Sequence, residues 1–541
     1  MLVLFVIAVL VYLPGIDAGM PEATAPGTTR SWIADELGPI GPIVEPMNAF
    51  HHQGEGNPQY PMFHYFFLLL VYLPYLAFQL LTGGLAHPHA GYPFGFRNPA
   101  GAVRTLLLIS RGVSVVMGGA VVAMAYLTAS KLWDRWAGRI SAVCALLMYP
   151  MYYYARTSNV DVPGLFWFSL VLYVFVRILQ DGLTTRRAVW VGVFSALAVA
   201  TKDLNYALIV MLPMVFLPAH YRRLREAGKT SFWEFARAPL AGGLLSAVLY
   251  GFASGLFISP LKYANHLEFI RTGSISYRYY FEFPLTLKGS IGLARRCLEF
   301  FGVSMGWPLL LAGVAGALLC LKSERLKLAI LLPIPGLFYL ALFPVGYVEV
   351  RYLMSGYLIL GMFAGNALSR GMRARHAAVR WAAVAVLAGG CGVAALRDAD
   401  IVYATQRDAR YTASAWFAQH TRAGDSVEIF SPLKSLVFYP RLPAGLVVIP
   451  SEATPSPGVA NLKGDFVLVM GKHLPDERWR CPAWVYEGLQ NGSLGYLLAA
   501  RITTPTLYLH PEPEVNPQME VYVRRDRAAG AGITSRSTPQ P

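Results

Sequence analysis

Charged residues are scarce in this 541-residue sequence, and its cysteines show no paired arrangement. Asp, Glu, Lys and Arg make up 14% of the chain, against roughly 25% in a typical soluble domain. The five cysteines have no C-x-x-C spacing, and three lie in apolar runs, which excludes a disulfide framework and a zinc module. No glycine-rich phosphate loop is present, which excludes a nucleotide site of that kind.

Long apolar runs are abundant instead. Hydrophobic residues make up 55% of the chain, and a membrane-spanning helix needs about 20 mostly apolar residues. The sequence therefore predicts a polytopic α-helical membrane protein, with no cleavable signal peptide because the first run lacks a basic flank and an A-x-A site. The candidate runs are 1–13, 62–82, 112–130, 137–154, 163–178, 188–201, 204–219, 238–258, 298–320, 328–344, 352–368 and 379–396.

Basic residues gather in five clusters that follow alternate runs. If these clusters are cytoplasmic, every pair of runs from residue 112 onward alternates correctly. They explain the net charge of +15 (46 − 31), and no basic face interleaved with aromatic residues predicts nucleic-acid binding. The clusters are Lys131/Arg135/Arg139, Arg177/Arg186/Arg187, Arg222/Arg223/Arg225/Lys229, Lys322/Arg325/Lys327 and Arg370/Arg373/Arg375/Arg380.

The run over 62–82 breaks this alternation, because a crossing there would place every basic cluster outside. Its many aromatic residues and its central Pro74 are typical of an interfacial or re-entrant segment. A true span, with another run failing to cross, stays open. We expect about eleven crossings of the plasma (inner) membrane, with the N-terminus cytoplasmic and the C-terminus extracytoplasmic.

The outer side carries three regions long enough to build a site. Residues 1–396 are predicted to form a transmembrane domain with two long outer loops, 14–111 and 259–297. Beyond it, DARYTASAWFAQHT has helical spacing, while SVEIF, LVVIP, FVLVM and MEVYVRR predict strands between Gly/Pro turns. We expect a small extracytoplasmic α/β domain over 397–527 and a disordered tail over 528–541.

Ionisable side chains at membrane level are costly, so they are functional candidates. A carboxylate can act as a general base, and cations can stabilise the charge on a phosphate leaving group, so the outer set suits a reaction on a lipid-linked phosphate. The candidates are Asp35 and Glu36 in SWIADELGPIGP, Arg156 and Asp161 in ARTSNVDVPG, Lys202 after VGVFSALAVAT, His266 and Arg271 in KYANHLEFIRTGSISYRYY, and Arg351 in VRYLMSGYLIL.

Each of these candidates also has a structural alternative. Asp161 shortly before Pro163 is an ordinary helix start, and Lys202 can snorkel to the membrane surface beside Asp203. The basic and aromatic stretch over 262–280 can form an amphipathic interface helix. Because sequence alone does not show that these loops converge, both interpretations stay open.

Five stretches, in this order, resemble the C-type (GT-C) membrane glycosyltransferases that use polyprenyl-phosphate sugars, a superfamily that includes the protein O-mannosyltransferases and the aminoarabinose transferases of lipid A. The likeness covers roughly residues 1–370. Asp35-Glu36 matches the acidic pair of the family's first outer loop, and Asp161 falls at its second acidic position. The other three stretches are NPQYPMFHYF, similar to K-P-P-L-h-Y-W, ALAVATKD, and VEVRYLMSGYLILGMFAGNAL, which matches R-Y-L-L-P-L-Y-P-L-L.

The resemblance implies a GT-C fold and assigns roles within it. Asp35, with Glu36 beside it, takes the position of the catalytic base, and Asp161 positions the sugar or the acceptor. Tyr60 stands where the family often has a phosphate-binding lysine, and Gln59 stands where some members have a metal-binding Glu. No metal ligands are predicted, although a divalent metal stays open. The residues expected to bind substrate are Lys202, Arg351, Arg271, His266, Arg156 and Tyr60.

The sequence thus predicts a glycosyltransferase, hexosyl or pentosyl, that moves a sugar from a polyprenyl-phosphate donor to a lipid, glycan or protein acceptor on the extracytoplasmic face. A transporter or flippase of lipid-linked glycans is one alternative, although no inverted repeat is evident and the ionisable residues cluster at the ends of runs. A non-catalytic membrane assembly subunit is the other.

Overall fold

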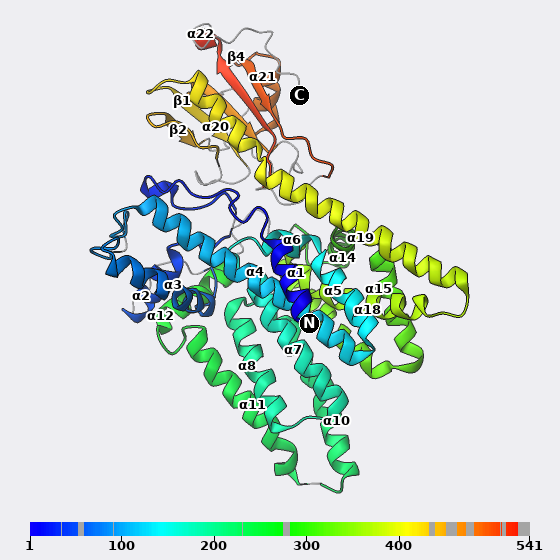
Figure 1. The fold of residues 1–541 in the computed structure, drawn as a ribbon. Coiled ribbons are helices and arrows are strands. Elements are labelled where there is room, and N and C mark those ends of the chain that lie inside the picture. The colour runs from blue at the N-terminus through cyan, green and yellow to red at the C-terminus, as the bar shows by residue number, and fades with distance from the viewer. Residues whose placement is uncertain are drawn as a thin grey trace. The chain divides into compact units, whose positions relative to one another are not determined.

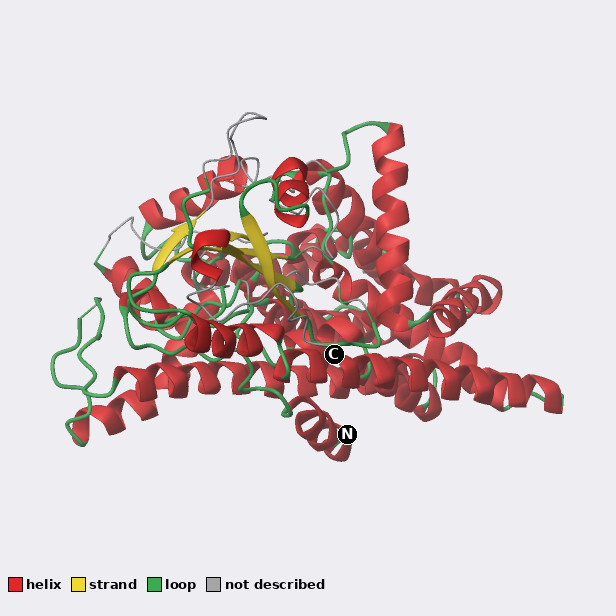
Figure 2. Cartoon of the chain, turned by 90° about the horizontal axis from the view of Figure 1, so that it is seen from above, coloured by secondary structure: helices red, strands yellow, loops and turns green. Residues whose placement is uncertain are grey.

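The chain divides into two compact units (Figure 1), Met1–Ile16 with Asp35–Asp398, and Asp17–Ala34 with Ala399–Pro541. Figure 2 shows helices throughout and the strands gathered in one small region. The computed structural model describes residues 1–33, 35–51, 59–89, 91–229, 231–273, 282–431, 439–450, 462–471, 481–508, 510 and 515–528. The tail predicted over 528–541 lies, after its first residue, outside them.

The first unit is built from helices. Its helices are α1 (Leu2–Tyr12), α2 (Gly41–Phe50), α3 (Phe63–Leu81), α4 (Pro99–Leu132), α5 (Arg135–Leu146), α6 (Tyr149–Tyr154), α7 (Asp161–Asp181), α8 (Thr185–Thr201), α9 (Asn205–Ile209), α10 (Pro213–Glu226), α11 (Phe232–Ala253), α12 (Pro260–Glu268), η2 (Phe269–Gly273), α14 (Leu287–Met305), α15 (Trp307–Ser323), η3 (Arg325–Leu331), α16 (Pro333–Leu337), η4 (Phe338–Leu342), α17 (Phe343–Val345), η5 (Val350–Leu353), α18 (Met354–Met372) and α19 (Ala377–Gln406). The last of these continues into the second unit.

Side-chain caps fix where several helices begin. Asn98 accepts a hydrogen bond from the Gly101 N–H at 2.9 Å, ahead of Pro99 in the first turn of α4. Asp134 accepts hydrogen bonds from the Trp136 and Ala137 N–H groups at the start of α5. Such caps satisfy backbone donors that the helix itself leaves free. Helix α4 therefore begins at Pro99, thirteen residues before the predicted run.

Among the described residues, seven helical segments are long and apolar enough to cross a membrane, and eight if the bent pair α14–α15 counts as one. The chain is therefore a multi-pass membrane protein, but the predicted number of about eleven crossings is not confirmed. Helix α1 has only eleven residues, short of the roughly 20 that a span needs. Helix α3 is among the seven by length and composition, so its interfacial placement stays a prediction.

The candidate span over 298–320 is divided between two helices. Helices α14 and α15 meet there at an angle of 110°. Gly306, between them, has a left-handed φ of 74°, which a residue without a Cβ adopts at little cost. Pro308 follows in the first turn of α15, where its missing N–H does no harm. The run over 137–154 is likewise divided, into α5 and α6, ahead of Pro150.

The five basic clusters meet at one end of the helices, as their predicted common side requires. Basic side chains of these clusters contact acidic side chains or a carbonyl group of other helices. These contacts connect the loops at this end of the helices. The contacts are Lys131–Asp181 at 3.6 Å, Arg187–Asp181 at 3.3 Å, Arg223 Nη2 to the Leu179 carbonyl at 2.8 Å, Lys327–Glu324 at 2.7 Å, Arg370–Glu324 at 2.5 Å and Arg373–Asp134 at 2.5 Å.

Helices α8 and α11 approach so closely that their backbones touch. A Cβ at Gly192 would lie 2.3 Å from the Gly242 carbonyl oxygen, and a Cβ at Gly242 would lie 2.4 Å from that of Ala188. Small residues that allow such approach are a common means of packing membrane helices. Helix α8 is thereby held against α11, and Lys202 directly follows its last residue.

The second unit is a small α/β fold with a five-stranded sheet in the order β2-β1-β3-β5-β4. The first three strands are parallel, and β5 runs antiparallel to both of its neighbours. Four strands and one helix were predicted and are confirmed, whereas β4 was missed. The elements are α20 (Ala409–His420), β1 (Ser426–Phe430), β2 (Val447–Pro450), β3 (Phe466–Met470), α21 (Ala483–Gln490), β4 (Tyr496–Ile502), β5 (Met519–Arg524) and α22 (Arg525–Ala528).

The central strand β3 shows how this sheet is packed. Phe466, Leu468 and Met470 lie in one apolar cluster with residues of α20, while Val467 and Val469 lie in another with residues of α21. Side chains alternate between the two faces of a strand, so helices cover both faces. A strand buried on both faces has a continuous apolar sequence, as FVLVM does.

The segment before Asp35 belongs to this second unit. The Trp32 ring lies under the guanidinium groups of Arg410 and Arg441, at 4.5 and 5.1 Å, and 4.6 Å from the Tyr411 ring. The Tyr411 hydroxyl accepts a hydrogen bond from the Gly19 N–H at 3.0 Å. Cations over an indole face are attracted to it, so Trp32 anchors the segment to α20.

Adding a methyl group at Gly242 should loosen the contact between α8 and α11. Gly242→Ala places a Cβ against backbone, and overpacking of this kind costs about 1–3 kcal/mol. We expect a lower melting temperature in detergent. Gly243→Ala, one residue along the same helix and open on that side, should leave it unchanged or higher. Equal effects of the two substitutions would contradict this packing.

Candidate active site

Asp35 lies in a turn held from two sides. Its φ is +60°, a left-handed conformation that costs a non-glycine residue of order 1–3 kcal/mol. Its carboxylate accepts hydrogen bonds from Gln59 Nε2 at 3.0 Å and from Arg351 Nη2 at 2.5 Å. Because both partners come from distant parts of the chain, the surrounding fold sets the position of this carboxylate.

Asp161 and Lys202 form a second ion pair. Asp161 is the first residue of α7, and Lys202 directly follows the last residue of α8. The Lys202 Nζ donates a hydrogen bond to Asp161 Oδ1, and it lies 4.7 Å from the centre of the Tyr352 ring. The packing of α7 against α8 therefore places an acid and a base of different helices in contact.

Arg351 joins the two pairs. It lies in the turn η5, just ahead of α18. Its Nη2 contacts Asp35, and its Nη1 lies 3.9 Å from Asp161 Oδ2. The rings of Tyr154 and Tyr352 lie 5.7 and 5.6 Å from its guanidinium carbon. Acid and base alternate in the order Asp35, Arg351, Asp161, Lys202, and we call these four residues the charged row.

The surroundings shift the pKa values of groups in and beside this row. Burial raises the pKa of Asp35, but the charge and hydrogen bond of Arg351, together with Gln59, bring it below its usual range. Burial lowers the pKa of Lys202, and the Asp161 carboxylate opposes that shift. Burial, with the nearby Asp35 charge, raises the pKa of Tyr60 well above 10. At neutral pH, Asp35 is therefore ionised and Tyr60 is a neutral hydroxyl.

Glu36 faces away from the charged row, although it is adjacent to Asp35. It accepts hydrogen bonds from Arg111 Nε at 2.9 Å, from Arg111 Nη2 at 3.0 Å and from the Ser158 N–H at 2.7 Å. Arg111 also donates to the Ile16 carbonyl at 2.7 Å. Both side chains are buried, so this pair ties the Asp35 turn to α4 and to the loop before α7.

Arg156 also lies apart from the charged row. Its Nε donates to the Tyr12 carbonyl at 3.1 Å, and its guanidinium carbon lies 4.2 Å from the centre of the Tyr152 ring. It is buried and joins α6 to the end of α1. These contacts are with the protein itself, and the predicted role of Arg156 in substrate binding stays a prediction.

The remaining predicted residues, Tyr60, His266 and Arg271, differ in whether they lie near the charged row. Tyr60 lies near the charged row, with its hydroxyl 3.4 Å from Gln59 Nε2. His266 is buried, and its Nε2 lies 3.1 Å from a carboxylate oxygen of Asp203, the neighbour of Lys202. Arg271 is exposed and pairs with Glu268 on the same helical stretch. The structure thus brings Tyr60 to the row, leaves His266 beside it, and does not bring Arg271 there.

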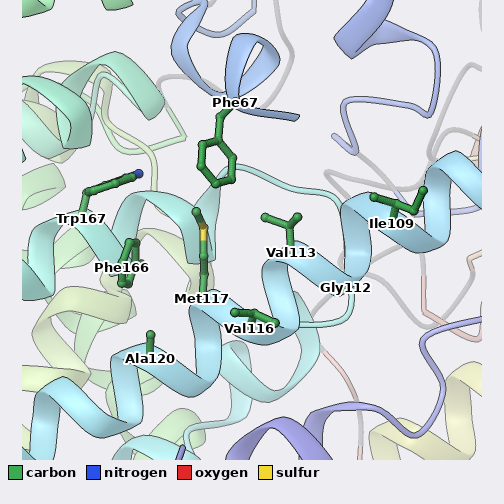
Figure 3. A pocket seen from close by; sticks show the side chains of 9 residues that line it. All are labelled: Phe67, Ile109, Gly112, Val113, Val116, Met117, Ala120, Phe166 and Trp167. Carbon is green, nitrogen blue, oxygen red and sulfur yellow. The ribbon is translucent and has the colours of Figure 1, made fainter. Parts of the chain in front are cut away.

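An apolar groove of about 650 Å³ opens between α3, α4 and α7. Figure 3 shows Phe67 of α3 pointing toward Met117 of α4, with Phe166 and Trp167 of α7 on one side of the groove and Val113 of α4 on the other. The surface that lines this groove is almost entirely apolar. Such a surface suits a hydrocarbon chain rather than a polar ligand.

A metal site does not stand out in the described part of the chain. No three His, Cys, Asp or Glu residues lie close enough together there to hold an ion. The His64 side chain is fully buried, and its ring stacks on Phe67. His51 is exposed, with Nδ1 2.8 Å from the Met47 carbonyl, and His52 lies outside the described residues.

Two residues of the site were missed as contacts. Gln59 was noted only as a departure from a family pattern, yet its amide holds the Asp35 carboxylate. Arg111 was placed at the end of the predicted outer loop 14–111, directly before the run over 112–130, although a fully buried arginine needs an acidic partner. An arginine at the start of an apolar run is itself the signal that could have identified it.

The fold and the charged row define a multi-pass membrane protein with an ionic centre and an apolar groove. A family model described as dolichyl-phosphate-mannose-protein mannosyltransferase matches residues 108–234. The match contains Asp161 and Lys202, but neither Asp35 nor Arg351. It confirms the predicted resemblance to the C-type membrane glycosyltransferases.

Several solved structures are similar to this chain at low identity. ArnT from Cupriavidus metallidurans in the apo state is 14% identical, covers 96% of this chain and 97% of its own, and has a TM-score of 0.48. The same protein bound to undecaprenyl phosphate is 15% identical, with 83% and 85% coverage and a TM-score of 0.47. The Archaeoglobus fulgidus oligosaccharyltransferase complex with Zn and sulfate is 14% identical, with 78% coverage and a TM-score of 0.44, and this chain spans 56% of its length. No curated protein matches the sequence.

Removing Arg111 should destabilise the first unit strongly. Arg111→Met leaves the Glu36 carboxylate buried without its cation, and breaking a buried pair in this way costs about 3–5 kcal/mol. We expect a large loss of thermal stability in detergent, partly restored by the double variant Arg111→Met/Glu36→Gln. Arg271→Gln, in an exposed pair, should have no measurable effect. A stable Arg111→Met protein would contradict the structural role of this pair.

Proposed function

We propose that this protein is a membrane glycosyltransferase that moves a sugar from a polyprenyl-phosphate donor to an acceptor. The observation that carries the proposal is the convergence of two carboxylates and two cations beside an apolar groove. Cations suit a phosphate, a carboxylate suits an acceptor proton, and the groove suits an isoprenoid chain. The predicted acceptor is a hydroxyl or amine of a lipid, a glycan or a protein.

The groove is near enough to the charged row for one lipid phosphate to use both. Asp161 begins α7, and Phe166, which lines the groove, lies five residues further along the same helix. Five residues of α-helix span about 7.5 Å. A phosphate at the row therefore leaves its hydrocarbon chain a short path to the groove.

The transfer itself would be one displacement at the anomeric carbon of the sugar. The acceptor oxygen or nitrogen forms a bond to that carbon and loses its proton to the Asp35 carboxylate. The bond from the carbon to the phosphate oxygen breaks, and its electron pair stays on the polyprenyl phosphate. Arg351 and Lys202 stabilise this charge, and Asp161 holds Lys202 in place.

The sidedness of the site follows from the charge pattern. Asp161 and the residue before Lys202 lie at the ends of α7 and α8 opposite to Arg177 and Arg187. Under the positive-inside rule the basic ends are cytoplasmic, so the proposed site faces the extracytoplasmic side of the plasma (inner) membrane. The second unit, on the same side in this topology, would take part in choosing the acceptor.

The other predicted site residues receive supporting roles in this proposal. Glu36 and Arg156 hold the turns that carry Asp35 and Asp161, as their buried contacts suggest. His266 keeps Asp203 beside Lys202, and Tyr60 lines the site with a neutral hydroxyl. Arg271 is exposed and has no part in the transfer step.

Replacing the proposed base should abolish transfer while leaving donor binding in place. Asp35→Asn keeps the size of the side chain but cannot accept the acceptor proton, so turnover should fall at least about 100-fold. The measurement is transfer of labelled sugar from synthetic polyprenyl-phosphate donors by purified protein. Glu268→Gln, an exposed carboxylate, is the matched control and should keep full activity. Equal activity of Asp35→Asn and wild type would move the base to another residue.

Arg351 should also set the pH range in which the free enzyme is active. Because the guanidinium lowers the pKa of Asp35, the wild-type carboxylate stays ionised below its usual range, and kcat/KM falls only as the pH drops through that lowered value. In Arg351→Gln, only Gln59 and Lys202 still oppose the effect of burial on this pKa, so the acid limb of kcat/KM should move to higher pH by about one unit or more. An unchanged limb would show that this pair does not control the base.

A further inference from the structure

The four residues of the charged row together have no net positive charge that would attract an anion. Its two cations face its two carboxylates, so its formal charge is zero, and each cation already has an acidic partner. A phosphodiester entering this site gains strong ionic contacts only if one of the two pairs opens. The structure shows which pair opens at the lower cost.

The two pairs differ in burial. The Asp161 side chain is 1% exposed, whereas the Asp35 side chain is 30% exposed. Removing the partner of a buried charge costs far more than removing that of a partly solvated one. The Asp35–Arg351 pair is therefore the one that can open, while Asp161 keeps Lys202.

Arg351 also has one N–H group that could donate a hydrogen bond to a ligand. Its Nε is buried and has no hydrogen-bond partner within the described structure, while its Nη2 is held by Asp35. A guanidinium can grip a phosphate with two parallel N–H groups. Asp35 would keep its hydrogen bond from Gln59, so the carboxylate retains a position when it leaves Arg351.

We infer that the donor phosphate displaces Asp35 from Arg351, so that binding of the donor releases the catalytic base. This inference rests on the proposed function and adds a coupling to it. Without donor, Asp35 is held in an ion pair and is a weak base. With donor bound, Arg351 faces the phosphate, and Asp35 is free to take the acceptor proton. The pair therefore keeps the base inactive until the donor is bound.

The same exchange changes the basicity of Asp35. Burial raises its pKa, and Arg351 is the main group that lowers it. When Arg351 turns to the phosphate, the pKa of Asp35 rises, and a carboxylate with a higher pKa is a better proton acceptor. The charged or titratable groups that face Asp35 are Arg351, Lys202 and Tyr60, while Asp161 and Tyr352 lie beside Arg351.

The test is binding of a short-chain polyprenyl phosphate to the purified protein in detergent. If Asp35 competes with the phosphate for Arg351, then Asp35→Asn should bind the lipid more tightly than wild type, by roughly threefold or more, as expected for a partly exposed ion pair. The same variant loses transfer, so loss of activity accompanies a gain in affinity. Unchanged or weaker binding would overturn the exchange.

A double-mutant cycle separates this exchange from the simple removal of a negative charge. In an Arg351→Gln background, the exchange predicts that Asp35→Asn no longer tightens binding. Tightening that persists in this background would overturn the proposal in favour of general electrostatics. A wild-type protein that does not bind polyprenyl phosphate at all would instead overturn the proposed function, so the two failures are distinct.

Wild-type protein gives a second readout if Asp35→Asn does not fold. A rise in the pKa of Asp35 on binding means that protons are taken up at a pH between its pKa values in the free and the lipid-bound protein. The probe is a polyprenyl methyl phosphodiester, whose own phosphate does not titrate there, and uptake is measured by calorimetry in buffers of different ionisation enthalpy. Proton uptake supports the exchange, and no uptake or proton release overturns it.

Discussion

The Arg351 guanidinium lies between the carboxylates of Asp35 and Asp161, and this contact brings together parts of the chain that are more than three hundred residues apart. Charges at the edge of a membrane are tolerated only when they are paired. The Asp35 turn, the start of α7 and the turn η5 must therefore take up one mutual arrangement, since a shift of any one of them leaves a charge without its partner. Helix packing, including the close contact of α8 with α11, is what supplies that arrangement.

Asp35 and Glu36 show how one turn can serve two purposes. The left-handed backbone at Asp35 sends two adjacent carboxylates into different surroundings. One stays partly solvated beside Arg351, and the other enters a buried pair with Arg111. The buried pair stabilises the turn against the cost of its backbone conformation, so the more exposed acid can remain available for chemistry.

Much of the architecture could be predicted from local patterns, because apolar runs and alternating strands leave direct signatures. The apolar runs identified the membrane helices. They did not identify the break at Gly306, since the sequence of an apolar run does not show whether a glycine in it has a left-handed φ. Strand β4 was missed because YLLAARI is rich in Leu and Ala, which favour helices over strands. The sequence singled out Asp35, Asp161, Lys202 and Arg351 one by one, but their convergence depends on tertiary packing. For the same reason, the sequence could not show that Arg156 is buried away from the charged row or that Arg271 is exposed.

The packing of Trp32 against Arg410 and Arg441 has a consequence for biosynthesis. Residues 17–34 are made early, but the groups that hold Trp32 leave the ribosome almost four hundred residues later. Until then the chain just ahead of Asp35 has no partner of its own unit to fold against. The membrane helices of the first unit can insert and pack in the meantime, because that unit is complete at Asp398. Residues 17–34 join the second unit only after its later residues have been made, and a chain shortened before Arg441 lacks one of the two cations that hold Trp32.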